Sequence, residues 1–212
     1  MTVIAIDGPA GSGKTTVARA VADRMGLEYL DTGSMYRSAT LAAIRAAVDL
    51  TDEHAVAAVV TPAQIDVGPT VLLDGDDVTD EIRGDAVSNA VSIVAAHPLV
   101  RDEMRERQRR WAAEHGGCVV EGRDIGSVVF PDADLKVFLT ATPEVRAQRR
   151  AAQTGDVYAS TVAKWAANIA ERDRLDMTRD DSPLVEADGS RSIDTTGMTV
   201  EEIVEEIAAA TP

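Results

Sequence analysis

The chain has 212 residues, which is enough for one α/β domain with small insertions and a substantial buried core. It carries 21 basic and 36 acidic side chains, a formal net charge of −15, which argues against a nucleic-acid-binding surface because such a surface usually needs a basic patch. Cys118 is the only cysteine, so no intrachain disulfide can form, and no apolar run approaches the roughly 18 residues of a membrane span. Since the N-terminus carries no signal-peptide pattern, we expect a cytoplasmic protein that binds neither nucleic acid nor membrane.

The N-terminal segment indicates a strand, a glycine-rich loop and a helix. Residues 3–6 form a short apolar run, and an amphipathic helix is predicted from about residue 13 to Met25, ended by Gly26. Between them, residues 8–15 fit G-x-x-x-x-G-K-[ST] at every fixed position. A glycine-rich turn can match this string by chance. The strand before it and the helix after it are the context of a phosphate-binding P-loop, so we favour that interpretation.

Each part of this loop has a chemical role in binding a nucleotide. Glycines let backbone N–H groups converge on a phosphate, and the helix that follows points the positive end of its dipole at the same group. Lys14 supplies a mobile charge for the β- and γ-phosphates, and the Thr15 hydroxyl can ligate Mg²⁺, the expected cofactor. The predicted ATP contacts of this segment are Gly8, Pro9, Ala10, Gly11, Ser12, Gly13, Lys14, Thr15 and Thr16.

The next part of the chain first continues and then breaks this alternation of strands and helices. A strand is predicted at residues 27–30 and an alanine-rich helix at 35–48. Between about 50 and 95 the pattern changes to short β-like runs separated by Gly-Pro and Gly-Asp turns, followed by a helical stretch at 85–96. This change indicates a small inserted subdomain. The expected β-like runs are 65–67, 71–74 and 77–79.

The remainder returns to an alternating α/β pattern. A polar helix is predicted at 100–114, and most of its arginines are expected on a solvated surface. Cys118 lies in an apolar strand and is interpreted as a small core residue. A capping box over residues 199–202 starts the last helix. The other predicted elements are strands at 118–121, 135–139 and 192–194 and helices at 143–150 and 162–176, with a break at 154–156.

Other motifs narrow the class of P-loop protein. Residues 194–197 match the D-x-x-G of GTPases, but no lysine follows an asparagine, so the guanine-reading N-K-x-D motif is absent. The L-S-G-G signature of transport ATPases is absent too. We therefore interpret residues 194–197 as a turn after a strand, and small-molecule or nucleotide kinases remain as the best class.

A stripe of charged residues suggests a second phosphate site. A kinase with a phosphorylated acceptor must hold several phosphates together, and arginine is suited to this. Arg172, Asp176 and Arg179 are spaced i, i+4, i+7 and share one helix face. A surface salt bridge is the alternative, but we favour a site because the stripe follows a segment expected to be mobile. Surface ion pairs remain our interpretation for the neighbours Glu171, Asp173 and Arg174.

Two further pairs follow predicted strands. Arg123 and Asp124 come directly after the strand at 118–121, and Tyr36 and Arg37 lie shortly after the strand at 27–30. Open parallel sheets bind their ligands at the carboxyl ends of their strands. A strand-end salt bridge is the alternative for the first pair, but both pairs are candidates for a ligand crevice.

Several longer strings carry a resemblance to a known family. With them the chain resembles the bacterial cytidylate kinases over nearly its whole length, the inserted region included. The strings are DGPAGSGK at 7–14, DTGSMYR at 31–37, DGDDVT at 74–79, VS at 91–92, PLVR at 98–101, GRDIG at 122–126, VFPDA at 129–133 and RD at 172–173.

The resemblance implies a role for each candidate residue. The implied readers of the cytosine base are Ser92, Arg101 and Asp124, and the implied clamp on the acceptor phosphate consists of Arg37, Arg123 and Arg179, with Tyr36 nearby. Further CMP contacts are Arg172 and Asp176, towards sugar and phosphate, and Thr32, which stands where many relatives have serine. Arg149 matches a lid-side contact to ATP. The residues expected to carry catalysis are Lys14, Arg123, Arg172 and Arg179.

The resemblance also implies the architecture and the reaction. The expected fold is α/β, with a P-loop NTPase core whose central parallel sheet is flanked by helices, an inserted α+β monophosphate-binding subdomain and a helical lid. The expected ranges are 1–36 for the core with the P-loop, 37–95 for the insert, 96–150 for core, 151–166 for the lid and 167–212 for core. The expected reaction transfers the γ-phosphoryl group of ATP to CMP or dCMP, giving CDP or dCDP and ADP, in a monomer.

Two alternatives remain at this point. One is a P-loop kinase that acts on UMP or on a non-nucleotide acceptor, and the other is a nucleotide-binding regulatory module without transferase activity. The acceptor oxygen of a nucleoside monophosphate is already ionised near neutral pH, so the reaction needs no general base. We therefore assign no chemistry to the three histidines.

Overall fold

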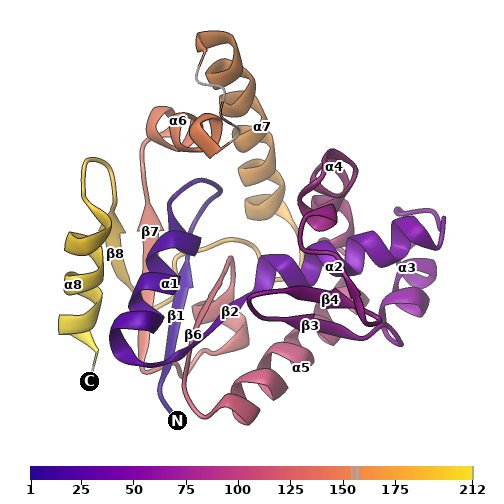
Figure 1. The fold of residues 1–212 in the computed structure, drawn as a ribbon, viewed down its shortest axis with the longest axis horizontal. Helices are drawn as coiled ribbons and strands as arrows, with labels where there is room; N and C mark the ends of the chain where they lie inside the picture. Colours follow the sequence, from indigo (N-terminus) through magenta and orange to yellow (C-terminus); the bar gives the residue numbers. More distant parts are fainter. Residues whose placement is uncertain (154, 156–157, 212) are drawn as a thin grey trace. The chain divides into compact units, whose positions relative to one another are not determined.

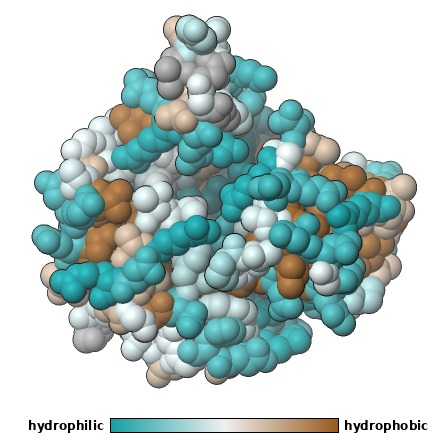
Figure 2. All heavy atoms as spheres, in the orientation of Figure 1, coloured by the Kyte–Doolittle hydropathy of each residue, from teal (hydrophilic) through white to brown (hydrophobic). Residues whose placement is uncertain are grey.

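The computed structural model describes residues 1–153, 155 and 158–211 (Figure 1). The chain forms two compact units: residues 1–29 with 115–212 make the first unit, and residues 30–114 make the second. Hydrophilic side chains predominate on the face shown in Figure 2, where apolar side chains form separate patches. Among the described residues, no helix combines the length and the apolar character needed to cross a bilayer.

The first unit is built on a five-stranded sheet in the order β2-β6-β1-β7-β8. β1 pairs in parallel with β6 and with β7, and β7 pairs in parallel with β8. All five residues of β1 are buried, as expected of a β-branched, apolar run covered on both faces. This arrangement confirms the predicted α/β fold with a central parallel sheet. The strands are β1 (Val3–Asp7), β2 (Glu28–Asp31), β6 (Cys118–Gly122), β7 (Leu135–Thr140) and β8 (Arg191–Asp194).

Helices cover this sheet and complete the core. α1 and α8 pack against each other, and their apolar side chains join those of the strands in one buried cluster (Figure 1). Gly26 ends α1 in the left-handed conformation, and the predicted capping box of Thr199 and Glu202 starts α8. The helices are α1 (Lys14–Met25), α6 (Pro143–Gln153), α7 (Ala159–Thr178) and α8 (Val200–Ala210), with a π-helical turn, η2 (Ile125–Val129).

The second unit combines helices with a small antiparallel sheet in the order β3-β4-β5. Its core includes Leu41 from α2, Val71 and Leu73 from β4, and Val87 from α4. The elements are α2 (Thr32–Arg45), α3 (Glu53–Val60), β3 (Ile65–Val67), β4 (Val71–Leu73), β5 (Asp76–Asp77), the 3₁₀ turn η1 (Glu81–Arg83), α4 (Asp85–Val94) and α5 (Pro98–His115).

The second unit departs from the sequence prediction at two helices. α2 begins three residues early, because the Asp31 side chain caps it by accepting a hydrogen bond from the Ser34 N–H. α3 was not predicted, although Asp52 caps it in the same way and is its local signal. The break predicted at 154–156 lies outside the described residues except for Gly155, and the proposed domain and lid boundaries stay predictions.

The arginines of α5 are less exposed than the sequence predicted. Arg109 and Arg110 are exposed, as expected of a solvated face, but Arg101 is buried and Arg107 is half-buried. The Arg107 guanidinium donates to the carbonyl oxygens of the last residue of α3, of the residue after it and of Ala63, the last at 2.7 Å. Arg107 therefore bonds carbonyl oxygens at and just after the C-terminus of α3, where helical partners are lacking.

Candidate active site

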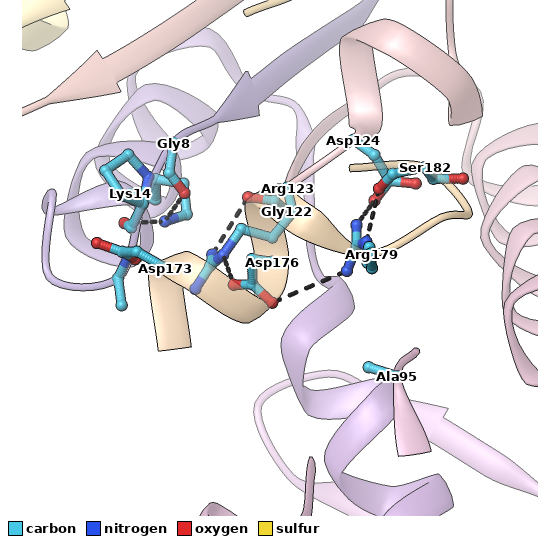
Figure 3. Close-up of polar contacts among 12 residues, drawn as sticks. Gly8, Lys14, Ala95, Gly122, Arg123, Asp124, Asp173, Asp176, Arg179 and Ser182 are labelled. Atoms are coloured by element: carbon cyan, nitrogen blue, oxygen red, sulfur yellow. Dashed lines mark hydrogen bonds and ion pairs between the residues drawn. The ribbon is translucent and has the colours of Figure 1, made fainter. Parts of the chain in front are cut away.

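The P-loop joins β1 to α1, and its three glycines have positive φ angles, a conformation that favours glycine. Gly8 has φ 150°, and a Cβ atom built there would lie 2.2 Å from the carbonyl oxygen of Leu139 on β7. No side chain fits at this position, so the loop can pass close to the sheet only with glycine. Lys14 is 6% exposed, and its Nζ donates to the carbonyl oxygens of Gly8 at 2.7 Å and Pro9 at 2.8 Å (Figure 3).

The surroundings of Lys14 disfavour its positive charge. Burial is the main cause, and the nearby cations Arg123 and Arg172 add to it, so the pKa of Lys14 falls from 10.5 to about 7. Glu121 and Asp7 oppose this shift without cancelling it. A bound polyphosphate would reverse the balance, because its negative charge favours the protonated amine.

Thr15 lies beside an acidic residue that sequence reasoning did not single out. Its Oγ1 donates to Oε2 of Glu121 at 3.1 Å, and the Tyr29 hydroxyl donates to the other carboxylate oxygen. Glu121 is 4% exposed and lies near the end of β6, the strand next to β1. The signal that could have found it is its position at the carboxyl end of a predicted strand. A hydroxyl and a carboxylate suit Mg²⁺, which prefers oxygen ligands and binds through one or two protein groups plus phosphates.

Asp7, the last residue of β1, is a second buried acid at the site. Its carboxylate accepts hydrogen bonds from the N–H groups of Ile125, at 2.9 Å, and Gly126, at 2.7 Å. Burial outweighs these two bonds and raises the pKa of Asp7 from 3.8 to about 6. The two bonds fix the start of η2, directly after Asp124.

Four of the predicted site residues form one network of charges in the first unit. Asp176 lies between two guanidinium groups, as Figure 3 shows: Nε of Arg123 donates to its Oδ2 at 2.8 Å, and Nη1 of Arg179 lies 3.9 Å from its Oδ1. Nη2 of Arg179 also lies 3.6 Å from Oδ1 of Asp124, and its Nε donates to the carbonyl oxygen of Ser182 at 2.6 Å. The structure therefore brings Asp176 and Arg179 to the strand-end pair. The prediction that Arg179 shares a helix face with Arg172 and Asp176 is wrong, because α7 ends at Thr178 and the backbone of Arg179 is extended.

The network favours the charged forms of Asp176 and Arg123. Burial opposes ionisation of the Asp176 carboxyl, but Arg123, Arg172 and Arg179 outweigh burial, and the pKa of Asp176 lies below its ordinary value. Burial likewise opposes the charge of Arg123, but Asp176 and other acids outweigh it, and the pKa of Arg123 is raised. The Arg172 charge acts on both Lys14 and Asp176, so this residue lies near enough to both groups to influence their ionisation.

Arg149 of α6 also contacts the P-loop. Its guanidinium donates to the carbonyl oxygen of Ser12 at 3.2 Å and to Oγ1 and the carbonyl oxygen of Thr195, each at 2.9 Å. Thr195 follows β8, and Asp194 accepts a hydrogen bond from the N–H of Thr196 at 2.9 Å. The D-x-x-G segment is thus a strand-end turn, as we interpreted it.

The other predicted site residues belong to the second unit. Arg101 is 1% exposed, its guanidinium carbon lies 5.5 Å from the centroid of the Tyr36 ring, and its Nη1 donates to the carbonyl oxygen of Ala95 at 3.1 Å.

Arg37 donates to the carbonyl oxygen of Ile82 and to Oγ of Ser88, both at 2.9 Å. Thr32 is buried at the start of α2, and Ser92 is half-buried on α4.

Comparison with known proteins decides the family. The family model for cytidylate kinase matches residues 4–212. The chain belongs to the cytidylate kinase family. It is 50% identical over 210 residues to the cytidylate kinase of Geobacillus kaustophilus (strain HTA426), covering 96% of this chain and 93% of that one. It is also 50% identical over 212 residues to the cytidylate kinase of Rhodococcus opacus (strain B4), covering 95% and 91%.

The fold also has a likeness among solved structures. The crystal structure of an uncharacterized protein from Eubacterium ventriosum ATCC 27560 superposes with a TM-score of 0.57, at 13% sequence identity. The match covers 99% of this chain and 97% of that one. At this identity the likeness concerns the fold alone.

The prediction for Asp173, on the charged face of α7, is wrong. Asp173 was expected in a surface ion pair, but it is 6% exposed and pairs with Arg146 of α6. Its helix position turns it towards the P-loop rather than towards solvent, as Figure 3 shows. The neighbouring pair was interpreted correctly: Arg174 and Glu171 form a salt bridge at 2.7 Å, and both side chains are 58% exposed.

The prediction for Cys118 is confirmed. It is buried in β6, and burial raises the pKa of its thiol to about 11. A thiol with so high a pKa is a poor nucleophile at neutral pH, so we give Cys118 a packing role only.

Proposed function

We propose that the protein transfers the γ-phosphoryl group of ATP to CMP or dCMP, giving CDP or dCDP and ADP. The observation that carries this proposal is that the first unit holds the P-loop lysine Lys14 close to Arg123 and Arg172. The charges of these two arginines lower the pKa of Lys14. A triphosphate-binding loop beside a second cationic site is what a kinase with a phosphorylated acceptor needs. Membership in the cytidylate kinase family and identities of 50% to two cytidylate kinases support CMP as that acceptor.

The chemistry requires positioning and charge neutralisation rather than proton transfer. The acceptor oxygen of a monophosphate is ionised near neutral pH, so it attacks without a base. Lys14 leaves the carbonyl oxygens of the P-loop and binds the phosphates of ATP. Arg37, Arg123 and Arg179 are proposed to clamp the acceptor phosphate. Arg123, Arg172 and Arg179 are proposed to offset the charge that develops on the transferred group. Thr15 and Glu121 are the residues proposed to hold Mg²⁺, which would supply further charge neutralisation when bound with ATP.

Selection of cytosine is proposed for residues in each unit. Cytosine offers an exocyclic amino donor and the acceptors N3 and O2, so its recognition needs an acceptor and a donor. In the first unit, the buried carboxylate of Asp124 is the proposed acceptor for the amino group. In the second unit, Arg101 and Ser92 are the proposed partners of N3 and O2, while Arg37, Tyr36 and Thr32 are proposed as further CMP contacts.

Several accompanying features are proposed with this function. Arg149, which donates to the P-loop carbonyl of Ser12, is proposed to contact ATP. A lid at 151–166 is proposed to exclude water, which would otherwise accept the phosphoryl group. We further propose that the enzyme acts as a monomer in the cytoplasm, where ATP and nucleoside monophosphates occur together.

A coupled assay of ADP release tests the proposal. With ATP and Mg²⁺ present, CMP, dCMP, UMP, AMP, GMP and dTMP are supplied one at a time. We expect fast turnover confined to CMP and dCMP. Turnover with another monophosphate would leave the P-loop chemistry standing but refute the cytosine assignment, and ADP release that never depends on an acceptor would favour a regulatory nucleotide-binding module.

A further inference from the structure

We propose that Asp173 and Arg146 are positioning residues that hold the P-loop in its ATP-binding shape by bonding both backbone polar groups of Ala10. Oδ1 of Asp173 accepts from the Ala10 N–H at 3.0 Å, and Nη1 of Arg146 donates to the Ala10 carbonyl oxygen at 3.0 Å. The second carboxylate oxygen of Asp173 pairs with the same Arg146 nitrogen. We call this arrangement the Ala10 clamp. It rests on the proposed use of ATP but not on the identity of the acceptor.

The clamp is buried and bridges distant parts of the chain. Asp173 is 6% exposed and Arg146 is 9% exposed. They lie 163 and 136 residues after Ala10 in the sequence, on α7 and α6. A buried carboxylate and a buried guanidinium are costly unless each is paired and hydrogen-bonded, and these two bond each other as well as Ala10. Because these residues are far apart in the sequence, the clamp can form only when the chain is folded.

The P-loop needs such support because it makes few backbone bonds of its own. Within it, the Ser12 N–H reaches the carbonyl oxygen of Pro9 only at 3.4 Å. Fixing the backbone of each residue costs about 1–2 kcal/mol of conformational entropy, and glycines raise that cost. If folding has already ordered the loop, ATP binding does not have to provide this free energy.

The backbone of α6 also limits the space at Gly11, the next residue of the loop. Gly11 has φ 76°, and a Cβ atom built on it would lie 3.0 Å from both Cβ and the carbonyl oxygen of Arg146. The backbone of α6 therefore packs directly on the peptide after Ala10. The loop is therefore held by hydrogen bonds at Ala10 and by close packing of α6 at Gly11.

The clamp also sets the position of α7 relative to the P-loop. Asp173 directly follows Arg172, whose charge acts on Lys14, and it precedes Asp176 by three residues. With Asp173 bonded to Ala10, α7 cannot slide or rotate without breaking a buried pair. The clamp therefore fixes Arg172 relative to Lys14, two of the residues proposed to carry catalysis.

Equilibrium binding of MgATP, measured by calorimetry, tests the clamp with the complete protein. Each variant is measured well below its own melting temperature, so that a loss of stability alone does not change the dissociation constant. We expect Asp173→Ala to weaken MgATP binding about 10-fold or more. Asp173→Asn should weaken it less, because its amide oxygen can still accept from the Ala10 N–H. The matched control is Glu171→Gln, which removes an exposed ion pair on the same helix and should leave binding unchanged.

A double-mutant cycle tests whether the two residues act together. Because Asp173 and Arg146 serve one residue, Asp173→Ala combined with Arg146→Met should weaken MgATP binding about as much as either change alone. Fully additive losses would refute the clamp, as would a folded Asp173→Ala protein that binds MgATP within 2-fold of the unaltered chain. If Asp173→Ala does not fold, Arg146→Met and its partial rescue in Arg146→Lys give the same test. Failure of the unaltered protein to bind MgATP would instead overturn the proposed function, and the clamp with it.

Discussion

Binding of MgATP at pH 8 should draw about one proton onto Lys14. In the free protein, burial and the neighbouring cations lower the pKa of Lys14 to about 7. At pH 8, roughly nine in ten molecules would then carry a neutral amine at this position. Bound phosphates favour the charged form, so the amine must be protonated as the complex forms.

The size of the effect follows from the pKa values. If the triphosphate returns the pKa of Lys14 to near its ordinary value of 10.5, uptake at pH 8 approaches about 0.9 proton per ATP bound. The dissociation constant should then rise by up to about tenfold per pH unit between pH 7 and pH 10, because each binding event removes a proton from solution. At pH 8, MgATP is fully deprotonated and contributes no titration of its own.

Calorimetry in two buffers of different ionisation enthalpy measures this uptake directly. The difference between the two observed enthalpies, divided by the difference in ionisation enthalpy, gives the number of protons. Arg123→Gln provides the control, since loss of this cation should raise the pKa of Lys14 and reduce uptake at pH 8. A proton count near zero in the unaltered protein, with MgATP bound, would refute the account of the Lys14 environment.

Three further predictions concern single residues. Arg123→Ala should lower turnover by orders of magnitude while leaving the thermal unfolding of the protein cooperative, and normal turnover in the steady-state assay would exclude Arg123 from the phosphate clamp. Ser92→Ala should raise KM for CMP relative to KM for other monophosphates, whereas an equal effect on all acceptors would count against base recognition by Ser92. Asp7 has a folded pKa near 6 against 3.8, so its contribution to stability is greatest below pH 4 and falls by about 3 kcal/mol as pH rises through 6. Urea unfolding from pH 4 to pH 7 should show that Asp7→Asn removes this part of the pH dependence, and parallel curves for the two proteins would contradict the expectation.

Features set by neighbouring residues were predictable from the sequence. The run at residues 3–6 forms β1, Gly26 ends α1, and Thr199 caps α8, because strand burial, a left-handed C-terminus and a capping box each depend on residues within a few positions. The P-loop was predictable for the same reason, since its glycines, lysine and threonine are consecutive. Even α3, which was not predicted, has a local capping signal at Asp52.

The strand-end residues show how far topology reasoning reaches. The carboxyl ends of neighbouring parallel strands meet at one edge of the sheet, which is why Arg123 and Asp124 could be expected at a ligand site. The same argument could have found Glu121 two residues earlier, but only the pairing of β6 with β1 puts its carboxylate against Thr15. The sequence limits such residues to an edge of the sheet, and the sheet order determines which of them meet.

The partners of buried charges were decided by the tertiary structure alone. Asp173 and Arg174 are adjacent in the sequence and both charged, yet Asp173 is buried against Ala10 while Arg174 forms an exposed pair with Glu171. Arg101 is buried in a helix whose arginines were mostly expected on a solvated surface. The free energy of burying a charge depends on the group that meets it, and for Asp173 the bonded backbone lies 163 residues away. Helix periodicity tells which side chains share a face, but only the packing of α6 and α7 on the P-loop determines which face is buried.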